Sequence, residues 1–209
     1  DGGILWRHWD YDSDRKDARR ARQLVLMYVA TIGNYDYAFN WIFHQDGRLE
    51  VRFDLTGILL PKAVKSSVCT YCEQLSRGQS PTNVNTDERY GHLVAANVVA
   101  THHQHFVNFR LDFDIDGRKN SAAEMNTRSL PAGPDNPFFN AFTMEKTVFQ
   151  REAAARREMS MQSSRKWHVF NPSMTNSLGH LTGFTLVPHE NAIPYALPEA
   201  AVRQRARLL

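Results

Sequence analysis

The region from residue 23 to residue 55 constrains the fold most, because it reads as strands separated by a tight turn. Residues 23–31 and 36–44 are rich in aliphatic and aromatic side chains, which favour strands. Gln45-Asp46-Gly47-Arg48 then supplies the Asp-Gly pair typical of a tight hairpin. After this turn, apolar residues alternate with charged ones over positions 49–55. Such alternation predicts a half-buried antiparallel strand.

The rest of the chain extends this pattern. Further strands are predicted at 91–99, 102–113, 141–149, 166–171 and 182–188. Long polar connections are predicted at 76–90 and 117–138, and the one helix at Gln150–Met161, where Glu, Ala and Arg favour helix. Spaced strands without βαβ alternation predict a mainly β fold, an antiparallel β-sandwich with one short helix. With no internal repeat or domain boundary, a single domain is expected over residues 1–209.

The charge balance argues against two classes of partner. The 25 basic and 22 acidic residues leave a formal net charge of +3. Basic residues within 15–22, 151–157 and 203–207 alternate with Asp, Glu or Ala, which is typical of a solvated face rather than a nucleic-acid stripe. No stretch approaches the ~20 apolar residues of a membrane span, and no signal segment is recognised. We therefore expect no nucleic-acid partner and no membrane span.

A tyrosine stands between an amide and a carboxylate at the end of the first apolar run. The sequence over positions 31–37 is Thr-Ile-Gly-Asn-Tyr-Asp-Tyr, and Gly33 permits a positive φ at this break. A phenol with a pKa near ~10 is a poor metal ligand and a poor oxidant at neutral pH. A bound Cu(II) ion would draw Tyr35 into its phenolate form and make the ring reactive towards dioxygen.

Three histidines crowd positions 102, 103 and 105. In a strand, side chains at i and i+2 share a face. His103 and His105 are therefore expected to point to the core, on a face whose other members are Val107, Phe109 and Leu111. His102 is expected on the opposite face of the strand, which is more exposed to solvent. Imidazole suits copper in both oxidation states, so His103 and His105 form the better ligand pair; the alternative is two solvated or core-satisfied histidines.

Both segments resemble the copper-containing primary-amine oxidases. In that family the aliphatic run and the motif around the tyrosine that becomes topaquinone are matched here by Leu24, Val25, Leu26, Thr31, Asn34, Tyr35, Asp36 and Tyr37. The family's copper-binding His-x-His pair matches His103 and His105, followed by an Arg-Leu-Asp-x-x-x-Asp-Gly segment at 110–117. The resemblance implies that dioxygen and a primary amine are converted to an aldehyde, ammonia and hydrogen peroxide. It also implies a homodimer and a large super-β-sandwich catalytic domain.

The resemblance gives roles to the neighbouring residues as well. Asn34 would hold the quinone in one orientation, and Asp36 would anchor the backbone or shape the substrate channel; turn chemistry is the alternative for both. Asp112, Asp114 and the carbonyl of Phe113 match a peripheral metal site of the family. Carboxylates with a main-chain carbonyl suit calcium. The alternative there is an acidic strand end that leads into a turn.

Two parts of the family's catalytic machinery have no match in this chain. The third copper histidine belongs to a Thr-x-Gly/Ser-x-x-His segment that is followed by an acidic pair and Pro, and His168, His180 and His189 lack that context. The catalytic aspartate lies well upstream of the quinone tyrosine, whereas only 34 residues precede Tyr35. The resemblance therefore implies an interior fragment of the catalytic domain. The alternative is a catalytically silent metal-binding β-domain on the same scaffold; a cupin-type oxygenase would need a Glu ligand shortly after His105, and none follows.

The cysteines, Cys69 and Cys72, form a Cys-Thr-Tyr-Cys segment. Such spacing occurs in redox-active pairs and in half of a zinc site, but no second cysteine pair completes a zinc site. Ordinary loop thiols, paired or free, are the expectation. They do not settle the compartment.

Overall fold

The structure, a computed structural model, describes residues 2–80, 89–189 and 193–206 and divides into two compact units. Unit 1 spans Asp1–His103 and unit 2 spans Gln104–Leu209. Within the described residues, four sheets contain two, three, three and four strands, and every strand pair is antiparallel. The mainly β, antiparallel fold class predicted from the sequence is confirmed.

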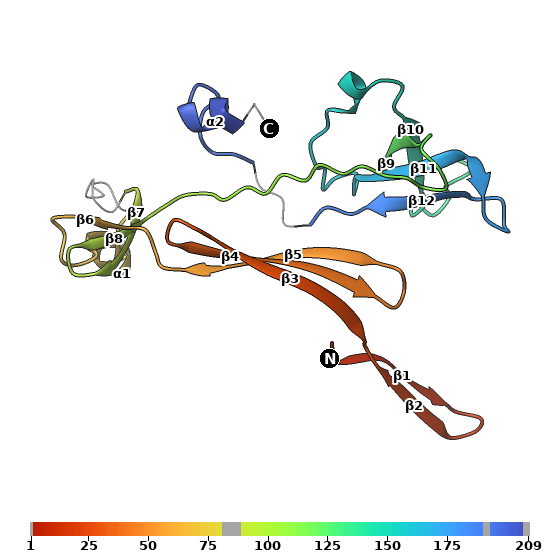
Figure 1. Cartoon of the computed structure of the whole chain (residues 1–209), viewed down its shortest axis with the longest axis horizontal. Helices are drawn as coiled ribbons and strands as arrows, with labels where there is room; N and C mark the ends of the chain where they lie inside the picture. The colour runs from red at the N-terminus through yellow and green to blue at the C-terminus, as the bar shows by residue number, and fades with distance from the viewer. Residues whose placement is uncertain (1, 81–88, 190–192, 207–209) are drawn as a thin grey trace. The chain divides into compact units, whose positions relative to one another are not determined.

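Unit 1 begins with a hairpin and a three-stranded meander (Figure 1). The hairpin consists of β1 (Ile4–Asp10) and β2 (Arg15–Arg20), and the meander of β3 (Gln23–Ile32), β4 (Tyr35–His44) and β5 (Leu49–Gly57). Both turns of the meander contain a glycine with positive φ, Gly33 at +64° and Gly47 at +84°. Tight hairpin turns need such a conformation, so the local sequence accounts for these strands.

The central strand β4 carries the interior of the meander. Asn40 and Ile42 are buried, with exposed fractions of 2% and 3%. The amide of Asn40 donates to the carboxylate of Asp54 at 2.9 Å, which satisfies a buried polar group. Phe39 stacks on Tyr28 with ring centroids 4.6 Å apart, linking β4 to β3.

The outer strand β3 is an apolar edge. It pairs only with β4 among the described strands. Consecutive residues of both faces are exposed by 45–62%, namely Leu24, Val25, Leu26, Met27, Tyr28 and Val29. A long apolar edge strand of this kind is normally covered in a folded protein.

A second small sheet of unit 1 has the order β6–β8–β7. Its strands are β6 (Pro61–Ala63), β7 (Gly91–Ala95) and β8 (Val98–Thr101), and α1 (Thr70–Ser76) lies between β6 and β7 in the chain (Figure 1). The single strand predicted at 91–99 is therefore wrong, because Asn97 adopts a φ of 64° and turns the chain back. The interior residue is Val99, which is 1% exposed.

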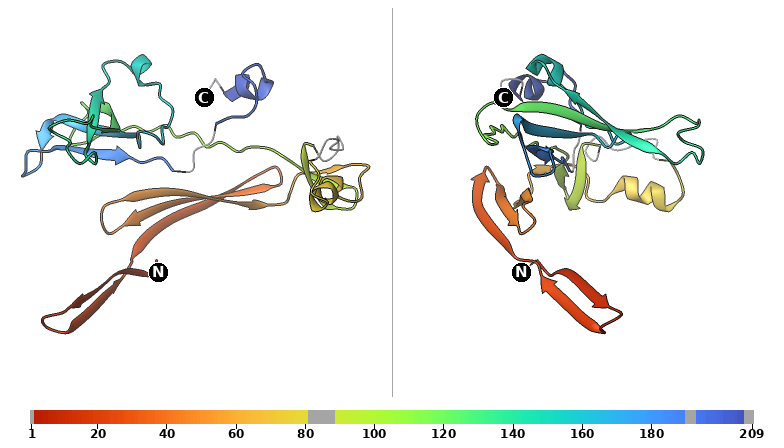
Figure 2. Two further views of the ribbon diagram at one scale, coloured as in Figure 1. Left: turned by 180° about the vertical axis from the view of Figure 1, so that it is seen from behind. Right: turned by 90° about the vertical axis from the view of Figure 1, so that its right-hand side faces the viewer.

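Unit 2 contains one four-stranded sheet of order β10–β9–β11–β12, seen from two further directions in Figure 2. The strands are β9 (Ser121–Ser129), β10 (Phe142–Val148), β11 (Lys166–Thr175) and β12 (Leu181–Leu186). The interior lies along β9 and β11, where Ala123 is fully buried and Phe170 is 4% exposed. The predicted strands at 141–149, 166–171 and 182–188 are confirmed to within a few residues.

Four strands were not predicted: β1, β2, β6 and β9. The case of β9 corrects the polar connection expected at 117–138. Its sequence, Ser-Ala-Ala-Glu-Met-Asn-Thr-Arg-Ser, has little β-propensity and no clear alternation. It nevertheless occupies the centre of the sheet, where pairing with β10 and β11 on its two edges outweighs the local preference. Residues 81–88 of the other expected connection lie outside the described residues.

The helix predicted at Gln150–Met161 is wrong in extent. Only a 3₁₀ turn, η1 (Glu152–Ala155), forms there, whereas the α-helices are α1 and α2 (Ala201–Ala206). Isolated short helices are marginal in water, so tertiary contacts decide the conformation. No helix in the described part of the chain is long and apolar enough to cross a bilayer.

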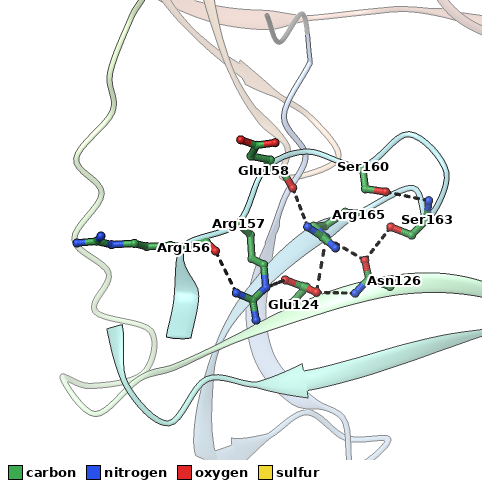
Figure 3. A network of polar contacts seen from close by, with 8 residues as sticks. All are labelled: Glu124, Asn126, Arg156, Arg157, Glu158, Ser160, Ser163 and Arg165. Carbon is green, nitrogen blue, oxygen red and sulfur yellow. Dashed lines mark hydrogen bonds and ion pairs between the residues drawn. The ribbon is translucent and has the colours of Figure 1, made fainter. Parts of the chain in front are cut away.

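A polar network holds the segment after η1 in its non-helical path (Figure 3). Glu124 on β9 is 7% exposed and forms ion pairs with Arg157 at 2.8 Å and Arg165 at 3.5 Å. Asn126 accepts hydrogen bonds from Ser163 at 2.8 Å and from Arg165 at 3.0 Å. Arg157 is thereby fixed to β9, and Arg165 also donates to the carbonyl of Glu158 at 2.8 Å, so the segment is held by contacts outside any helix of its own.

The strand predicted at 102–113 is also wrong. Strand β8 ends at Thr101, and residues 102–113 form no ladder with any strand of the described chain. A strand needs a hydrogen-bonding neighbour, and sequence alternation alone does not supply one. The apolar positions 107, 109 and 111 are 44–48% exposed, so the expected core face for His103 and His105 is not buried within the described chain.

Candidate functional site

Tyr35 is the first residue of β4 and directly follows the two-residue turn Gly33-Asn34. It pairs with Ile32 on β3 and with Gly57 on β5, and it is half-buried. A strand that begins at a tight turn and is paired on both edges holds its first residue rigidly. The phenol is therefore presented from the most constrained end of the meander.

Asn34 is fixed to the end of β5 by two hydrogen bonds. Its backbone carbonyl accepts the N–H of Ile58 at 2.7 Å, and its side-chain amide donates to the carbonyl of Ile58, also at 2.7 Å. The backbone and the side chain of Asn34 thus both contact Ile58. The amide predicted to lie beside the quinone is oriented by this pair of bonds.

Gly57 allows the close approach on which this contact depends. Its φ is +109°, a conformation that other residues rarely adopt. A Cβ added there would lie 2.5 Å from the carbonyl oxygen of Asn34 and 2.7 Å from the Cα of Tyr35. Only glycine fits at this position without a shift of the tyrosine backbone.

Asp36 contributes to the same hairpin from its other edge. The hydroxyl of Thr31 donates to its carboxylate at 2.6 Å, across the pair that joins β3 to β4. This bond connects two of the positions singled out in the sequence. It supports the anchoring role expected for Asp36.

His103 lies beside Tyr35, with ring centroids 5.4 Å apart and ring planes at 42°. Its Nδ1 is 2.8 Å from the carbonyl oxygen of Thr101. Because a carbonyl only accepts, Nδ1 carries the proton and Nε2 is the basic nitrogen. A ligating histidine commonly donates its other ring N–H to a carbonyl in this way, so His103 fits a copper ligand.

The remaining histidines are placed differently. The backbone N–H of His102 donates to the carbonyl of Tyr90 at 2.8 Å, which ties this residue to the start of β7. His105 belongs to unit 2, as does its neighbour Gln104, whose amide bonds the backbone of Ile193 and Tyr195. Over residues 2–80, 89–189 and 193–206, no three His, Cys, Asp or Glu side chains are grouped so that they could hold a metal ion.

The acidic segment at 112–116 lies at the edge of the unit 2 sheet. Asp114 and Asp116 line a surface hollow of about 540 Å³ together with Thr182 on β12. Asn171 holds the segment in place by donating to the carbonyls of Ile115 at 2.9 Å and Asp116 at 3.1 Å. Asp112 is exposed, and Phe113 stacks with Phe184 at 6.3 Å. The carboxylates of Asp112 and Asp114 are oxygen donors of the kind that calcium prefers.

Comparison with known families decides the identity. The enzyme domain of copper amine oxidases matches residues 1–208 of this chain. The chain belongs to the copper amine oxidase family. Histamine oxidase of Arthrobacter globiformis is 35% identical over 206 residues, which cover 99% of this chain and 27% of that protein. N-methylputrescine oxidase 1 of Nicotiana tabacum is 35% identical over 213 residues, covering 100% of this chain and 25% of that protein.

Solved structures of the family share the fold. The copper-containing benzylamine oxidase from Hansenula polymorpha matches with a TM-score of 0.78 and 24% identity, over 95% of this chain and 29% of that chain. The Aspergillus nidulans amine oxidase matches with a TM-score of 0.74 and 22% identity, over 98% and 25%. The chain thus spans about a quarter of the length of the family members it matches.

Three contributors to the candidate site could not be recognised as such in the sequence: Gly57, Ile58 and the Thr101 carbonyl. The sequence carries one indication for Gly57. A glycine near the end of a strand often marks a close approach of another backbone segment, and Gly57 follows the alternating residues 49–55. The contacts with the carbonyl groups of Ile58 and Thr101 cannot be recognised from the sequence, because every residue has a carbonyl group. They depend on strand pairing and on where β8 ends.

Proposed function

We propose that this chain is the part of a copper amine oxidase catalytic domain that carries the quinone tyrosine and two of the copper ligands. In this proposal the full-length protein oxidises a primary amine with dioxygen and releases an aldehyde, ammonia and hydrogen peroxide. The observation that carries the proposal is the contact between Tyr35 and His103, with the tautomer of His103 fixed by Thr101. It brings the hydroxylatable ring beside a suitable metal ligand.

Copper would be held by His103 and His105, and topaquinone would form from Tyr35. When bound, the copper ion and the quinone supply the redox chemistry that imidazole and phenol groups lack. The protein's own contribution is positioning. Asn34, clamped to Ile58, would limit rotation of the modified ring, and Asp36, bonded to Thr31, would keep the hairpin closed around it.

An interior position within a larger catalytic domain fits the surface of unit 1. The exposed apolar side chains of β3 alternate between two faces, so a layer on each face is needed to cover them. Residues 104–112 likewise have the composition of a strand but pair with none in the described chain. We propose that segments of the full-length protein cover both, and that its active form is a homodimer.

A peripheral calcium site is part of the same proposal. Asp112, Asp114 and the carbonyl of Phe113 would supply three of its oxygen ligands, fewer than the ~6–8 that calcium takes. Further ligands would have to come from elsewhere in the full-length protein.

The test is whether the quinone forms. Full-length protein loaded with copper in air should develop a visible quinone absorption and react with phenylhydrazine. Tyr35→Phe should lose both signals and keep stoichiometric copper, because only the hydroxylatable ring is removed. Tyr37→Phe is the matched control, since Tyr37 lies edge-on to Tyr35 at 6.4 Å and should not be modified.

Absence of both signals from the copper-loaded, unmodified protein would favour the alternative, a silent metal-binding β-domain.

The isolated 209-residue chain is a separate case. General-base catalysis is typically worth ~10²–10⁴-fold, and the proposed base lies outside this chain. We therefore expect little or no peroxide release from benzylamine by the isolated chain, and vigorous release would place the base within it.

A further inference from the structure

The two cysteines form a disulfide in a four-residue segment at the start of α1. Cys69 and Cys72 are bonded, with Cα atoms 5.4 Å apart. Cys69 caps the helix, and its Sγ accepts the backbone N–H of Cys72 at 3.1 Å. Cys69 is half-buried, whereas Cys72 is exposed. The two residues therefore differ in exposure, and the Sγ of Cys69 accepts a backbone hydrogen bond.

The disulfide contributes little to holding unit 1 together. A disulfide constrains the unfolded chain less as the loop that it closes becomes shorter, and this loop is very short. The connection before it is already fastened by Asn97, whose backbone and amide groups bond Val64, Lys65 and Ser66 over 3.0–3.3 Å. Helix α1 keeps its own hydrogen bonds, including those of Arg77 to Glu73 and Gln74. Opening of the disulfide would leave these contacts intact.

We propose that Cys69 and Cys72 are a reversible two-electron redox couple, opened by a dithiol and closed by hydrogen peroxide. In the opening reaction a thiolate of the dithiol attacks Sγ of Cys72, the more exposed residue of the pair, and breaks the Cys69–Cys72 bond. Cys69 leaves as a thiolate, which the N–H of Cys72 stabilises, and a better-stabilised leaving group departs faster. The second thiol of the reductant then displaces Cys72. The reductant becomes a disulfide, and its two protons end on Cys69 and Cys72.

The closing reaction rests on the proposed function, in which the full-length protein releases hydrogen peroxide. One cysteine thiolate attacks peroxide and breaks its O–O bond, giving a sulfenic acid and water. The other thiol attacks the sulfenic sulfur, forms the disulfide and releases a second water molecule. The protein loses two electrons and two protons, and peroxide is reduced to two molecules of water. The pair would thus remove peroxide at the expense of a thiol reductant.

The experiment titrates the pair in native full-length protein. The protein is equilibrated with mixtures of reduced and oxidised dithiothreitol, quenched in acid and alkylated, and the peptide carrying Cys69 and Cys72 is analysed by mass spectrometry. The dithiol fraction should follow the mixture in both directions, with the circular dichroism spectrum unchanged. A pair that opens only after denaturation, or whose opening abolishes the native spectrum, would overturn the proposal and make the disulfide a structural crosslink.

Peroxide is then added to the reduced protein without copper or amine, so the result does not depend on quinone formation. One equivalent should restore the disulfide; a dithiol that persists, or that is converted to sulfinic acid, would overturn the closing step. The order of attack is tested by brief exposure of the oxidised protein to a monothiol, followed by quenching in acid and mass spectrometry. The mixed disulfide should be found on Cys72. A mixed disulfide on Cys69, or equally on both cysteines, would overturn the assignment of Cys72 as the attacked sulfur.

Discussion

The imidazole of His103 lies beside the phenol of Tyr35, with ring centroids 5.4 Å apart. Tyr35 begins β4 of the meander, whereas His103 follows β8 of the other three-stranded sheet of unit 1. Each is held by backbone carbonyls: Asn34, which precedes Tyr35, bonds Ile58, and His103 bonds Thr101. The geometry of the candidate site therefore depends on the backbone, and a backbone change should damage it.

Gly57→Ala tests this dependence. A positive φ in a non-glycine residue costs about 1–3 kcal/mol, and the new Cβ would also lie 2.5 Å from the carbonyl oxygen of Asn34. We expect the backbone of Tyr35 to shift, with a rate of quinone formation lowered ~10-fold or more even when copper is bound, since a misplacement of about 1 Å can cost ~10²-fold. Absorption of the quinone after copper addition in air measures the rate.

Gly47→Ala is the matched control for Gly57→Ala. Gly47 has a φ of +84°, but a Cβ there would meet nothing within 4 Å. The Gly47→Ala variant should therefore lose only the stability that a positive φ costs a non-glycine residue, and it should form the quinone at the normal rate. If both variants slow quinone formation equally, the collision with Asn34 does not explain the need for Gly57.

A second prediction distinguishes the three histidines. His103→Ala and His105→Ala should each remove most copper from the full-length protein, because the remaining ligands cannot fill the metal's preferred set. His102→Ala should keep stoichiometric copper and a normal cupric resonance spectrum, because His102 contacts Tyr90 through its backbone N–H, which survives the change. Loss of copper from the His102 variant to the same degree would show that His102 is a ligand.

Local pattern predicts the meander well and the candidate site only in part. Strands β3, β4 and β5 follow from apolar runs and two glycine turns, which act over short distances in sequence. The contact of Tyr35 with His103 depends on where the β6–β8–β7 sheet lies, and no local signal encodes that. Residues 102–113 show the converse, because they alternate like a strand yet have no neighbour to pair with in the described chain. The His-x-His motif can be recognised from its residue types alone, although the strand predicted for it is wrong.

The ion pairs of Glu124 yield a third prediction, on stability. Glu124→Ala would leave Arg157 and Arg165 without the carboxylate that they share (Figure 3). Glu124 is buried, but the side chains of Arg157 and Arg165 are 38% and 21% exposed, so water screens the charges that are left behind and the cost is about 1–3 kcal/mol. Amides of β9 and β11 should therefore exchange with deuterium ~10–10²-fold faster, provided that they exchange by opening of this sheet.

Glu145→Ala on the neighbouring strand β10 is the control for Glu124→Ala. Glu145 pairs with Arg128 at 2.9 Å, but both side chains are about half exposed or more. An exposed pair of this kind is worth only about 0–1 kcal/mol, so exchange should change little. Equal effects of the two variants would show that burial of Glu124 does not strengthen its role.

The fourth prediction concerns the pKa of His168 on β11. Burial, and then the positive charge of Lys146, lower this pKa from its ordinary value of 6.5. Nζ of Lys146 donates to Nδ1 of His168 at 2.8 Å, and Phe170 stacks on the imidazole at 5.2 Å. Lys146→Gln removes the charge and keeps an N–H donor. The pKa of His168 should rise but stay below the ordinary value, because the burial remains; proton resonances of the imidazole followed against pH measure it.

The same change should alter how stability depends on pH. Since the folded protein has the lower His168 pKa, the unfolded chain binds more protons between that pKa and 6.5. The free energy of unfolding therefore falls as the pH drops through this window, and the fall should be smaller in Lys146→Gln. Lys119→Gln, which removes a lysine from the loop before β9, should leave the His168 pKa unchanged. An unchanged or lower His168 pKa in Lys146→Gln would show that the charge of Lys146 is not a cause of the shift.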